Sequence, residues 1–308
     1  MKNVVLVLFL GMFCNNVLAQ RDDVRLGLCD DLPLQFYQQD YRSIVIENGM
    51  GYCRSPEKIL DQRITAFKNL ESLTFLHSPL SAEYQDYTLP EEISELHNLS
   101  TLNTNIPNNA VFGLSSLTNL TLNIHGETTM ELLDEEGFYE LHQLEFLKLQ
   151  LYNGLANNYS IKGISGLKKL KEVRLYNPSQ QLIDEVLANP YIETLNINST
   201  IDVTFDFSKM LSLKELLLNG NGLDNIPPSI IELPLIEKLE ITNNDLTTIP
   251  SNIGEMKKLQ VLVLGRNKLS SIPSEITQCT SCEVALLLRL LLEVKILNMI
   301  KLLTIRLL

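Results

Sequence analysis

The chain has 308 residues and a formal net charge of −12, with 45% hydrophobic and 20% charged residues. This composition can bury a core, so the chain does not belong to the intrinsically disordered class. The acidic balance disfavours binding to nucleic acid or to anionic membrane surfaces, because both need a basic patch, whereas a basic partner would be attracted.

The first nineteen residues have the pattern of a secretory signal peptide. Lys2 supplies the positive start, residues 4–13 form an apolar run, and Val17-Leu18-Ala19 offers a cleavage site before Gln20. The apolar run is shorter than the roughly 20 residues that a helix needs to span a bilayer core. The sequence therefore predicts export, which would leave the protein secreted or placed in the cell envelope or at the cell surface.

Residues 20–69 do not fit the pattern that follows them and are predicted to form an N-terminal cap, because a solenoid needs a terminal unit over its first core layer. Within this segment, Ser43–Ile46 is expected to be a strand and Glu57–Phe67 a helix. Cys29 and Cys53 also lie here. Export permits them to pair as a disulfide, and the sequence leaves the pairing open.

Apolar triplets with the spacing i, i+3, i+5 recur from residue 70 onward. The copies begin, at intervals of 18 to 29 residues, at Leu70, Leu99, Leu117, Leu144, Leu170 and Ile192. The copy from Leu99 is in doubt because its third member, Thr104, is polar. The long intervals have room for helices, and Thr128–Gln143 and Gln181–Ala188 are predicted to be helical.

From Leu213 the pattern becomes regular and repeats three times with a period of 23 residues. Nine positions agree in chemistry in every copy, which in the first copy are Leu213, Leu216, Leu218, Asn221, Leu223, Ile226, Pro227, Ile230 and Leu233. The second copy begins at Ile236 and the third at Leu259, and the third ends at Cys279. A repeat array of this kind is predicted for residues 70–281, irregular to 212 and regular from 213.

This pattern resembles the leucine-rich-repeat family, in the form LxxLxLxxNxLxxIPxxIxxLxx. The resemblance implies an α/β solenoid with a curved parallel sheet on its concave side and short helices, turns or extended segments on its convex side. Alternate leucines of each short strand would point inward. The amides of Asn221, Asn244 and Asn267 can satisfy the turn backbone and are expected to form a ladder.

The pattern breaks in residues 282–308. The next copy should have an apolar residue at position 285 and Asn at position 290, where Ala285 and Leu290 stand. The rest is almost entirely apolar, with scattered charges. A membrane anchor, a degenerate repeat and a truncated or frame-shifted end are the alternatives. The third is favoured because this tail would cover the last core layer with no polar surface.

Catalytic and metal-binding motifs do not stand out in the sequence. Cys279 and Cys282 have CxxC spacing, but both fall on core positions of the repeat, where cysteine acts as a small hydrophobe. The four histidines form no ligand spacing, and the sequence contains neither a nucleophile elbow nor a glycine-rich phosphate loop. We therefore expect no enzymatic activity, no cofactor and no bound metal.

The outward strand positions are the candidate binding surface. The residues singled out there are Phe146, Lys148, Arg174, Tyr176, Asn196, Glu215, Lys238 and Glu240. Because aromatic residues and arginine dominate interface hot spots, Phe146, Arg174 and Tyr176 are predicted to form a patch on two adjacent strands.

The chain resembles exported bacterial leucine-rich-repeat proteins, which implies recognition of a protein or glycan partner. A structural or adhesive array and the substrate-recognition part of a larger protein are the alternative interpretations.

Overall fold

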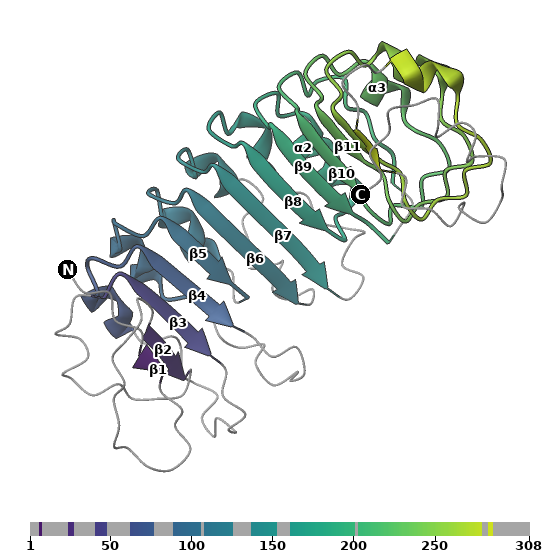
Figure 1. Cartoon of the computed structure of the whole chain (residues 1–308). Coiled ribbons are helices and arrows are strands. Elements are labelled where there is room, and N and C mark those ends of the chain that lie inside the picture. Colours follow the sequence, from purple (N-terminus) through teal and green to yellow (C-terminus); the bar gives the residue numbers. More distant parts are fainter. Residues whose placement is uncertain are drawn as a thin grey trace. The chain divides into compact units, whose positions relative to one another are not determined.

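The computed structural model describes residues 6–7, 24–27, 41–47, 62–76, 89–105, 108–125, 137–152, 161–200, 203–278 and 283–285. The chain forms two compact units. The first consists of Met1–Asn153 and Ile161–Gly163, and the second of Gly154–Ser160 and Ile164–Leu308. Within each unit, parallel strands follow one another in chain order and are joined by returns that carry short helices (Figure 1).

In the first unit each strand pairs in parallel with the next one along the chain. The strands are β1 (Leu6–Val7), β2 (Val24–Gly27), β3 (Ser43–Glu47), β4 (Ser72–Leu76), β5 (Thr101–Thr104), β6 (Asn119–His125) and β7 (Phe146–Tyr152). The returns carry the 3-10 helices η2 (Gln62–Ala66), η4 (Glu91–Glu95), η5 (Asn109–Gly113) and η6 (Gly137–Glu140). The strands of the first unit therefore stay in register although the repeats differ in length, because the extra residues lie in the returns between the strands.

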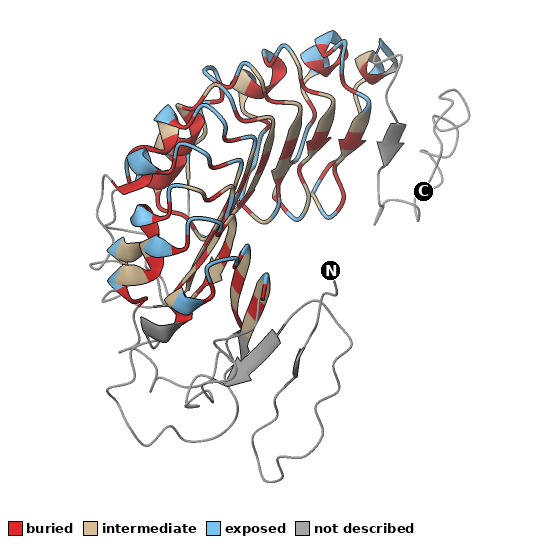
Figure 2. Ribbon diagram, turned by 90° about the vertical axis from the view of Figure 1, so that its left-hand side faces the viewer, coloured by how far each residue is buried: buried red, intermediate tan, exposed pale blue. Residues whose placement is uncertain are grey.

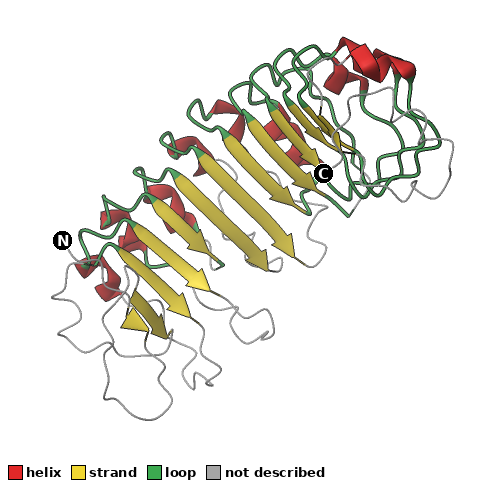
Figure 3. Ribbon diagram, in the orientation of Figure 1, coloured by secondary structure: helices red, strands yellow, loops and turns green. Residues whose placement is uncertain are grey.

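The second unit repeats the arrangement with shorter strands. These are β8 (Glu172–Tyr176), β9 (Thr194–Asn198), β10 (Glu215–Leu218), β11 (Lys238–Glu240), β12 (Val261–Val263) and β13 (Glu283–Ala285). Its helices are η8 (Ile164–Gly166), α2 (Gln180–Leu187), α3 (Pro228–Ile231), η9 (Ser251–Glu255) and η10 (Ser274–Gln278). The predicted architecture, a parallel sheet with short helices and extended returns behind it, is confirmed within each unit (Figure 3).

The core of each unit is built from the inward side of the strands. Leu102, Leu120 and Leu147 pair in one register and are completely buried, and so are Leu216 and Leu239 in the second unit. Buried and half-buried residues alternate along the strands, and further buried residues come from the short helices (Figure 2). Each buried leucine contributes about 1.5–3 kcal/mol, but one repeat cannot cover its own apolar face and depends on its neighbours.

A recurring hydrogen-bond pattern fixes the start of several strands in both units. Two consecutive amides donate to a single carbonyl of the preceding repeat: Glu145 and Phe146 donate to Thr118 O (2.8 and 3.0 Å). In the second unit, Lys214 and Glu215 donate to Glu193 O in the same way (2.8 and 3.0 Å). The same bonds recur at irregular and regular repeats, so the strand starts are equivalent although the sequence intervals differ.

The helix predictions were partly right. The helix expected at Gln181–Ala188 is α2, and the hydroxyl of Ser179 accepts a hydrogen bond from Leu182 N (3.2 Å) at its start. The helix expected over Thr128–Gln143 is wrong in its described part, where residues 137–140 form the 3-10 helix η6. Of the helix expected over Glu57–Phe67, residues 62–66 form the 3-10 helix η2. An α-helix is about 10 Å wide while strands lie about 4.8 Å apart, so narrow 3-10 turns stack more easily behind them.

The doubt about the copy from Leu99 is also resolved. Its strand β5 pairs with β4 and β6, and Thr104 is completely buried where other repeats have a leucine, an isoleucine or, in the copy from Leu70, a phenylalanine. A threonine therefore serves as an inward residue in this layer, and the polar third member did not mark a break.

The two ends of the described sheet extend the register further than the sequence suggested. The predicted strand at Ser43–Ile46 is β3, and β2 and β3 pair in parallel with the strands that follow them. At the other end β13 aligns Val284 with Leu262. The last interval is thus 22 residues rather than 23, so Val284 and not Ala285 is in register with Leu262. Residues 279–282 and 286–308 lie outside the described residues.

Candidate binding surface

The outward strand residues of the second unit form a single ordered surface. Pairing aligns Arg174 with Asn196 and Tyr176 with Asn198, then Thr194 with Glu215 and Asn196 with Leu217, and further on Glu215 with Lys238 and Leu217 with Glu240. We call this surface the second-unit face; it consists of Glu172, Arg174, Tyr176, Thr194, Asn196, Asn198, Glu215, Leu217, Asn219, Lys238, Glu240, Thr242, Val261 and Val263. Arg174 and Asn219 are exposed and the others are half-buried.

The same side of the first unit has a different chemistry. Its outward residues, the first-unit face, are Ser72, Thr74, Thr101, Asn103, Asn105, Asn119, Thr121, Asn123, Phe146, Lys148 and Gln150. Hydroxyl and amide groups dominate this face. The amide of Asn123 donates to Asn103 Oδ1 on the neighbouring strand (3.1 Å). Such a surface offers many neutral hydrogen-bonding groups and little charge.

The residues predicted to form one patch are divided between the two units. Phe146 and Lys148 lie on β7 of the first unit, whereas Arg174 and Tyr176 lie on β8 of the second. Within the second unit, Arg174 and Tyr176 point to the same side of the strand, because they are two positions apart. The patch described in the second unit is therefore Arg174 and Tyr176 with their partners across the strand, Asn196 and Asn198.

Four of the charged residues on the second-unit face form two pairs. The guanidinium of Arg174 donates through Nε to Glu172 Oε1 (2.6 Å), and Nη2 lies 2.6 Å from the same oxygen. Lys238 Nζ lies 4.0 Å from Glu240 Oε2 on β11. Exposed pairs of this kind stabilise little, but the Glu172 contact holds the Arg174 side chain in one orientation.

The asparagine turns connect successive repeats behind the second-unit face. Asn244 Oδ1 accepts hydrogen bonds from the amides of Asn221 and Leu223 (2.9 and 3.1 Å), and its Nδ2 donates to Leu218 O and Thr242 O (both 2.8 Å). Asn267 Oδ1 likewise accepts from Leu246 N (3.2 Å). The asparagine side chains bond to backbone groups of the preceding repeat, so they satisfy turn groups that have no strand partner.

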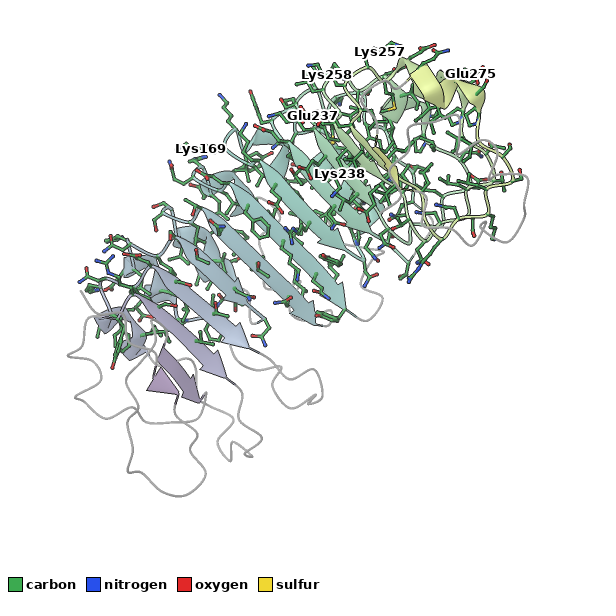
Figure 4. All side chains as sticks on the ribbon, in the orientation of Figure 1. Lys169, Glu237, Lys238, Lys257, Lys258 and Glu275 are labelled. Atoms are coloured by element: carbon green, nitrogen blue, oxygen red, sulfur yellow. The ribbon has the colours of Figure 1, made fainter. Side chains whose placement is uncertain are left out.

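A row of alternating charge runs just before the strands of the second unit. Glu193 lies between Lys171 Nζ (2.9 Å) and Lys214 Nζ (2.6 Å), which come from the repeats on either side. Hydrogen bonds from Lys214 and then Lys171 lower the pKa of the Glu193 carboxyl, and Glu193 in turn raises the pKa of Lys214. Glu237 continues the row in the next repeat and lies along the same edge as Lys169 and Lys258 (Figure 4).

One structural residue was not found by the sequence analysis. Asn189 is completely buried, its Nδ2 donates to Ile164 O (2.7 Å) and Leu167 O (3.1 Å), and its Oδ1 accepts from Tyr191 N (2.8 Å). The corresponding position in other repeats is apolar, as in Leu167 and Met210. The sequence did contain a signal for Asn189, since it is a polar residue at a repeat position that is otherwise apolar.

Two kinds of feature, metal sites and membrane-spanning helices, are absent from the described part of the chain. Within these ranges, no group of three or more His, Cys, Asp and Glu side chains is arranged to hold a metal ion. The same ranges contain no helix with the length and apolar character needed to cross a bilayer. Cys29, Cys53, Cys279 and Cys282 lie outside the described residues, as do most of residues 1–19.

Comparison with known proteins identifies the repeat. Residues 211–269 match the family model of leucine rich repeats. Residues 211–269 are therefore leucine-rich repeats, and the parallel strands of both units have the leucine-rich-repeat fold. No match was found among curated proteins.

Several solved structures are similar to this leucine-rich-repeat protein. The plant peptide hormone receptor RGFR1 in complex with RGF2 aligns with 85% of this chain and 41% of its own, at 19% identity and a TM-score of 0.52. This likeness shows the fold. A leucine-rich-repeat protein of Leptospira interrogans covers 85% of this chain and 89% of its own, at 21% identity and a TM-score of 0.34. An internalin from Listeria monocytogenes covers 72% and 75%, at 16% identity and a TM-score of 0.42.

Proposed function

We propose that this leucine-rich-repeat protein is a non-catalytic binding module that recognises a protein partner through its strand faces. The observation that carries the proposal is that the two sides of the sheet differ in each unit. The inward leucines are completely buried, while the outward residues form an ordered surface whose helices lie behind the sheet. A rigid sheet that presents side chains at fixed spacing gives a partner many contacts at little conformational cost.

Within the second-unit face, the proposed contact residues are a central pair, Arg174 and Tyr176, and charged residues on the strands that follow. Tyr176 and Arg174 are the residue types that contribute most at protein interfaces, and Asn196 lies beside Arg174 on the next strand. Glu215, Lys238 and Glu240 follow on β10 and β11 and would select the partner by charge rather than add much affinity.

The first unit would contribute Phe146 and Lys148 from β7. The plant receptor that shares the fold is described in complex with a peptide ligand, which agrees with a protein partner for this chain.

The neutral first-unit face also favours a second candidate, a glycan. Hydroxyl and amide groups such as Thr101, Asn103 and Asn123 match the donors and acceptors of sugars, and Phe146 could stack against a sugar ring. Binding of neutral oligosaccharides to a glycan array, reduced at least tenfold by Asn103→Ala, would establish this candidate in place of the protein partner.

The proposed setting is outside the cytoplasm. The signal pattern in residues 1–19 supports export, with the binding unit secreted or held at the cell surface. N-terminal sequencing of the protein recovered from its native cells is expected to start at Gln20. Recovery of an intact Met1 terminus from the cell surface or the medium would overturn this cleavage.

Site-specific photocrosslinking tests the binding face. A photoreactive benzoyl-phenylalanine at position 196 lies on the second-unit face, whereas the same group at position 255 lies on the exposed part of η9 behind the sheet. With native cell-surface extract, we expect a discrete protein adduct from position 196 that is absent from position 255. Adducts should decrease at least fivefold when Tyr176→Ala and Arg174→Ala are added. Equal adduct patterns from both positions would refute recognition by this face.

A further inference from the structure

An exposed apolar stripe crosses the second unit at the turns that lead into its strands, outside the second-unit face. The residues three and four positions before the register residues Glu172, Thr194, Glu215, Lys238 and Val261 are equivalent, because those register residues pair across β8 to β12. In chain order the five pairs are Lys168-Lys169, Pro190-Tyr191, Leu211-Ser212, Pro234-Leu235 and Lys257-Lys258. Three apolar turns in a row are thus bordered on both sides by two lysines.

The exposure of this stripe is unusual for the molecule. Leu211 is 58% exposed and Tyr191 is 38% exposed, and both belong to the three exposed large hydrophobic residues of the described chain. Pro234 is exposed and Leu235 half-buried beside them. The first unit has polar residues at the same turns, for example His97 and Ser115. Repeat geometry therefore does not require apolar residues there, and a continuous exposed apolar strip commonly marks an interaction site.

The charges around the stripe are placed at its two ends. Lys168 and Lys169 are exposed at one end, and Lys257 and Lys258 at the other, as the labelled side chains of Lys169, Lys257 and Lys258 show along this edge (Figure 4). The end turns lie four strand spacings apart, which is about 19 Å along the sheet. Between them, Lys171 and Lys214 are paired with Glu193. The two lysine pairs thus place positive charge at both ends of the stripe.

We propose that this edge binds an acidic protein segment that has apolar residues in its centre and carboxylates near both ends. The apolar centre would cover Tyr191, Leu211 and Leu235, and the carboxylates would lie against the two lysine pairs. An extended segment advances about 3.3 Å per residue, so six residues bridge the distance between the lysine pairs.

Two other occupants fit the observations less well. A second copy of this chain packed symmetrically on the stripe would be centred near Leu211 and would bring Lys168 and Lys169 against Lys257 and Lys258, which is repulsive. An anionic bilayer is a broad surface and would also meet the acidic neighbours of the stripe, Glu193 and Glu232, on a chain of net charge −12. A narrow peptide meets only the stripe and its ends.

The test uses the full chain and three labelled peptides. The acidic probe is Asp-Asp-Leu-Leu-Phe-Leu-Asp-Asp, the basic control has Lys in place of Asp, and the polar control has Ser in place of Leu and Phe. Fluorescence anisotropy is expected to show binding of the acidic probe that is at least tenfold tighter than that of either control. Equal binding of the acidic and basic peptides would overturn the proposal.

Variants locate the contact. Lys168→Glu with Lys169→Glu is expected to weaken acidic-probe binding at least tenfold, and Leu211→Ser about fivefold. Tyr139→Ser is the matched control, because Tyr139 is 46% exposed in the first unit, and it should change binding less than twofold. Leu211 is mostly exposed, so a loss of binding with unchanged circular dichroism and thermal midpoint reports the contact rather than the fold.

Two further measurements distinguish this proposal from the strand-face function and from membrane binding. Arg174→Ala with Tyr176→Ala should leave acidic-probe binding unchanged, so failure of the strand-face function and failure of the edge site are distinguishable. Vesicles of phosphatidylserine and phosphatidylcholine form the last arm. Vesicle binding that Leu211→Ser abolishes, together with no peptide binding, would assign the edge to a membrane surface and overturn the protein partner.

Discussion

The first unit and the asparagine repeats of the second unit have the same kind of core, but their strands end differently. Leu120 in the first unit and Leu239 in the second are both completely buried at the same repeat position. Five residues after them, the first unit has His125 and the second has Asn244. Asn244 makes four hydrogen bonds to the repeat before it and to its own turn. Buried leucines therefore make repeats stack, while the asparagine fixes the turn and with it the constant repeat length.

The outward surfaces differ as much as the turns. The first-unit face consists mainly of neutral hydroxyl and amide groups, whereas the second-unit face carries paired charges and aliphatic residues such as Leu217 and Val263. The inward positions tolerate little variation because they must fill a packed core, and the outward positions are under no such constraint. We therefore expect the outward residues to determine which partner is bound, and we expect the two faces to suit partners of different polarity and charge.

The largest expected effect tests whether the two cores are equivalent. Leu120→Ala and Leu239→Ala should each lower the free energy of unfolding by about 4 kcal/mol, because each leaves a cavity in a fully packed layer. Urea unfolding followed by far-ultraviolet circular dichroism measures the change. Since repeat arrays can unfold in parts, hydrogen exchange of each unit should be followed as well. A cost at one site less than half of that at the other would show that the two cores are not packed alike.

The next effect tests the asparagine turn. Asn244→Ala should lower the free energy of unfolding by about 3 kcal/mol, because it leaves buried backbone donors and acceptors without partners. Asn221→Ala should cost less, about 1–2 kcal/mol, since Asn221 Oδ1 has no hydrogen-bond partner in the described structure.

Asn123→Ala is the control for the asparagine turn. Asn123 is half-buried on the first-unit face, where its side chain donates to Asn103, and its loss should cost less than about 1 kcal/mol. Equal costs for Asn123 and Asn244 would contradict the special role of the turn.

Much of the fold could be predicted because the spacing of apolar residues in each repeat indicates which strand positions are aligned. The inward positions of Leu147, Val173 and Leu195 follow from the triplet spacing alone, and strand pairing agrees with them. The helix predicted over Thr128–Gln143 was wrong in its described part, because helical periodicity is a local signal, whereas the space behind a strand is limited by the neighbouring repeats.

The candidate site was harder to predict. Alternation identified which residues of β8 and β9 point outward, but the spacing did not show that Phe146 and Arg174 lie in different compact units. The edge stripe around Leu211 was also missed. The stripe can be recognised by comparing the residues at one equivalent exposed turn position in five repeats. These positions can be aligned only when the strand register is known.

A smaller effect tests backbone strain just before the asparagine turns. Gly220, Asn243 and Arg266 occupy equivalent positions with φ of 70°, 55° and 54°. Glycine adopts this left-handed conformation freely, asparagine tolerates it, and arginine does so at a cost of about 1 kcal/mol. Arg266→Gly should therefore raise the midpoint of urea unfolding and Gly220→Ala should lower it, each by the equivalent of about 1 kcal/mol. Changes of the same sign in both variants would rule out strain as the cause.

The smallest effect tests the alternating charges before the strands. The pKa of the Glu193 carboxyl is lowered by Lys214 and Lys171, so its stabilising contribution is present above the unfolded value of about 4.3 and is lost as the pH falls through the lower folded value. The Glu193 side chain is 32% exposed, so Glu193→Gln should cost less than about 1 kcal/mol at pH 7 in low salt, and this cost should decrease as the pH falls to 2.5.

The Arg42–Glu71 pair of the first unit is the matched control for Glu193, with an N–O distance of 2.7 Å and about half of each side chain exposed. Glu71→Gln should change the free energy of unfolding by less than Glu193→Gln, because Glu71 is paired with Arg42 whereas Glu193 lies between two lysines. A loss from Glu193→Gln that stays constant between pH 7 and pH 2.5 would mean that packing of the side chain, and not its charge, stabilises the row.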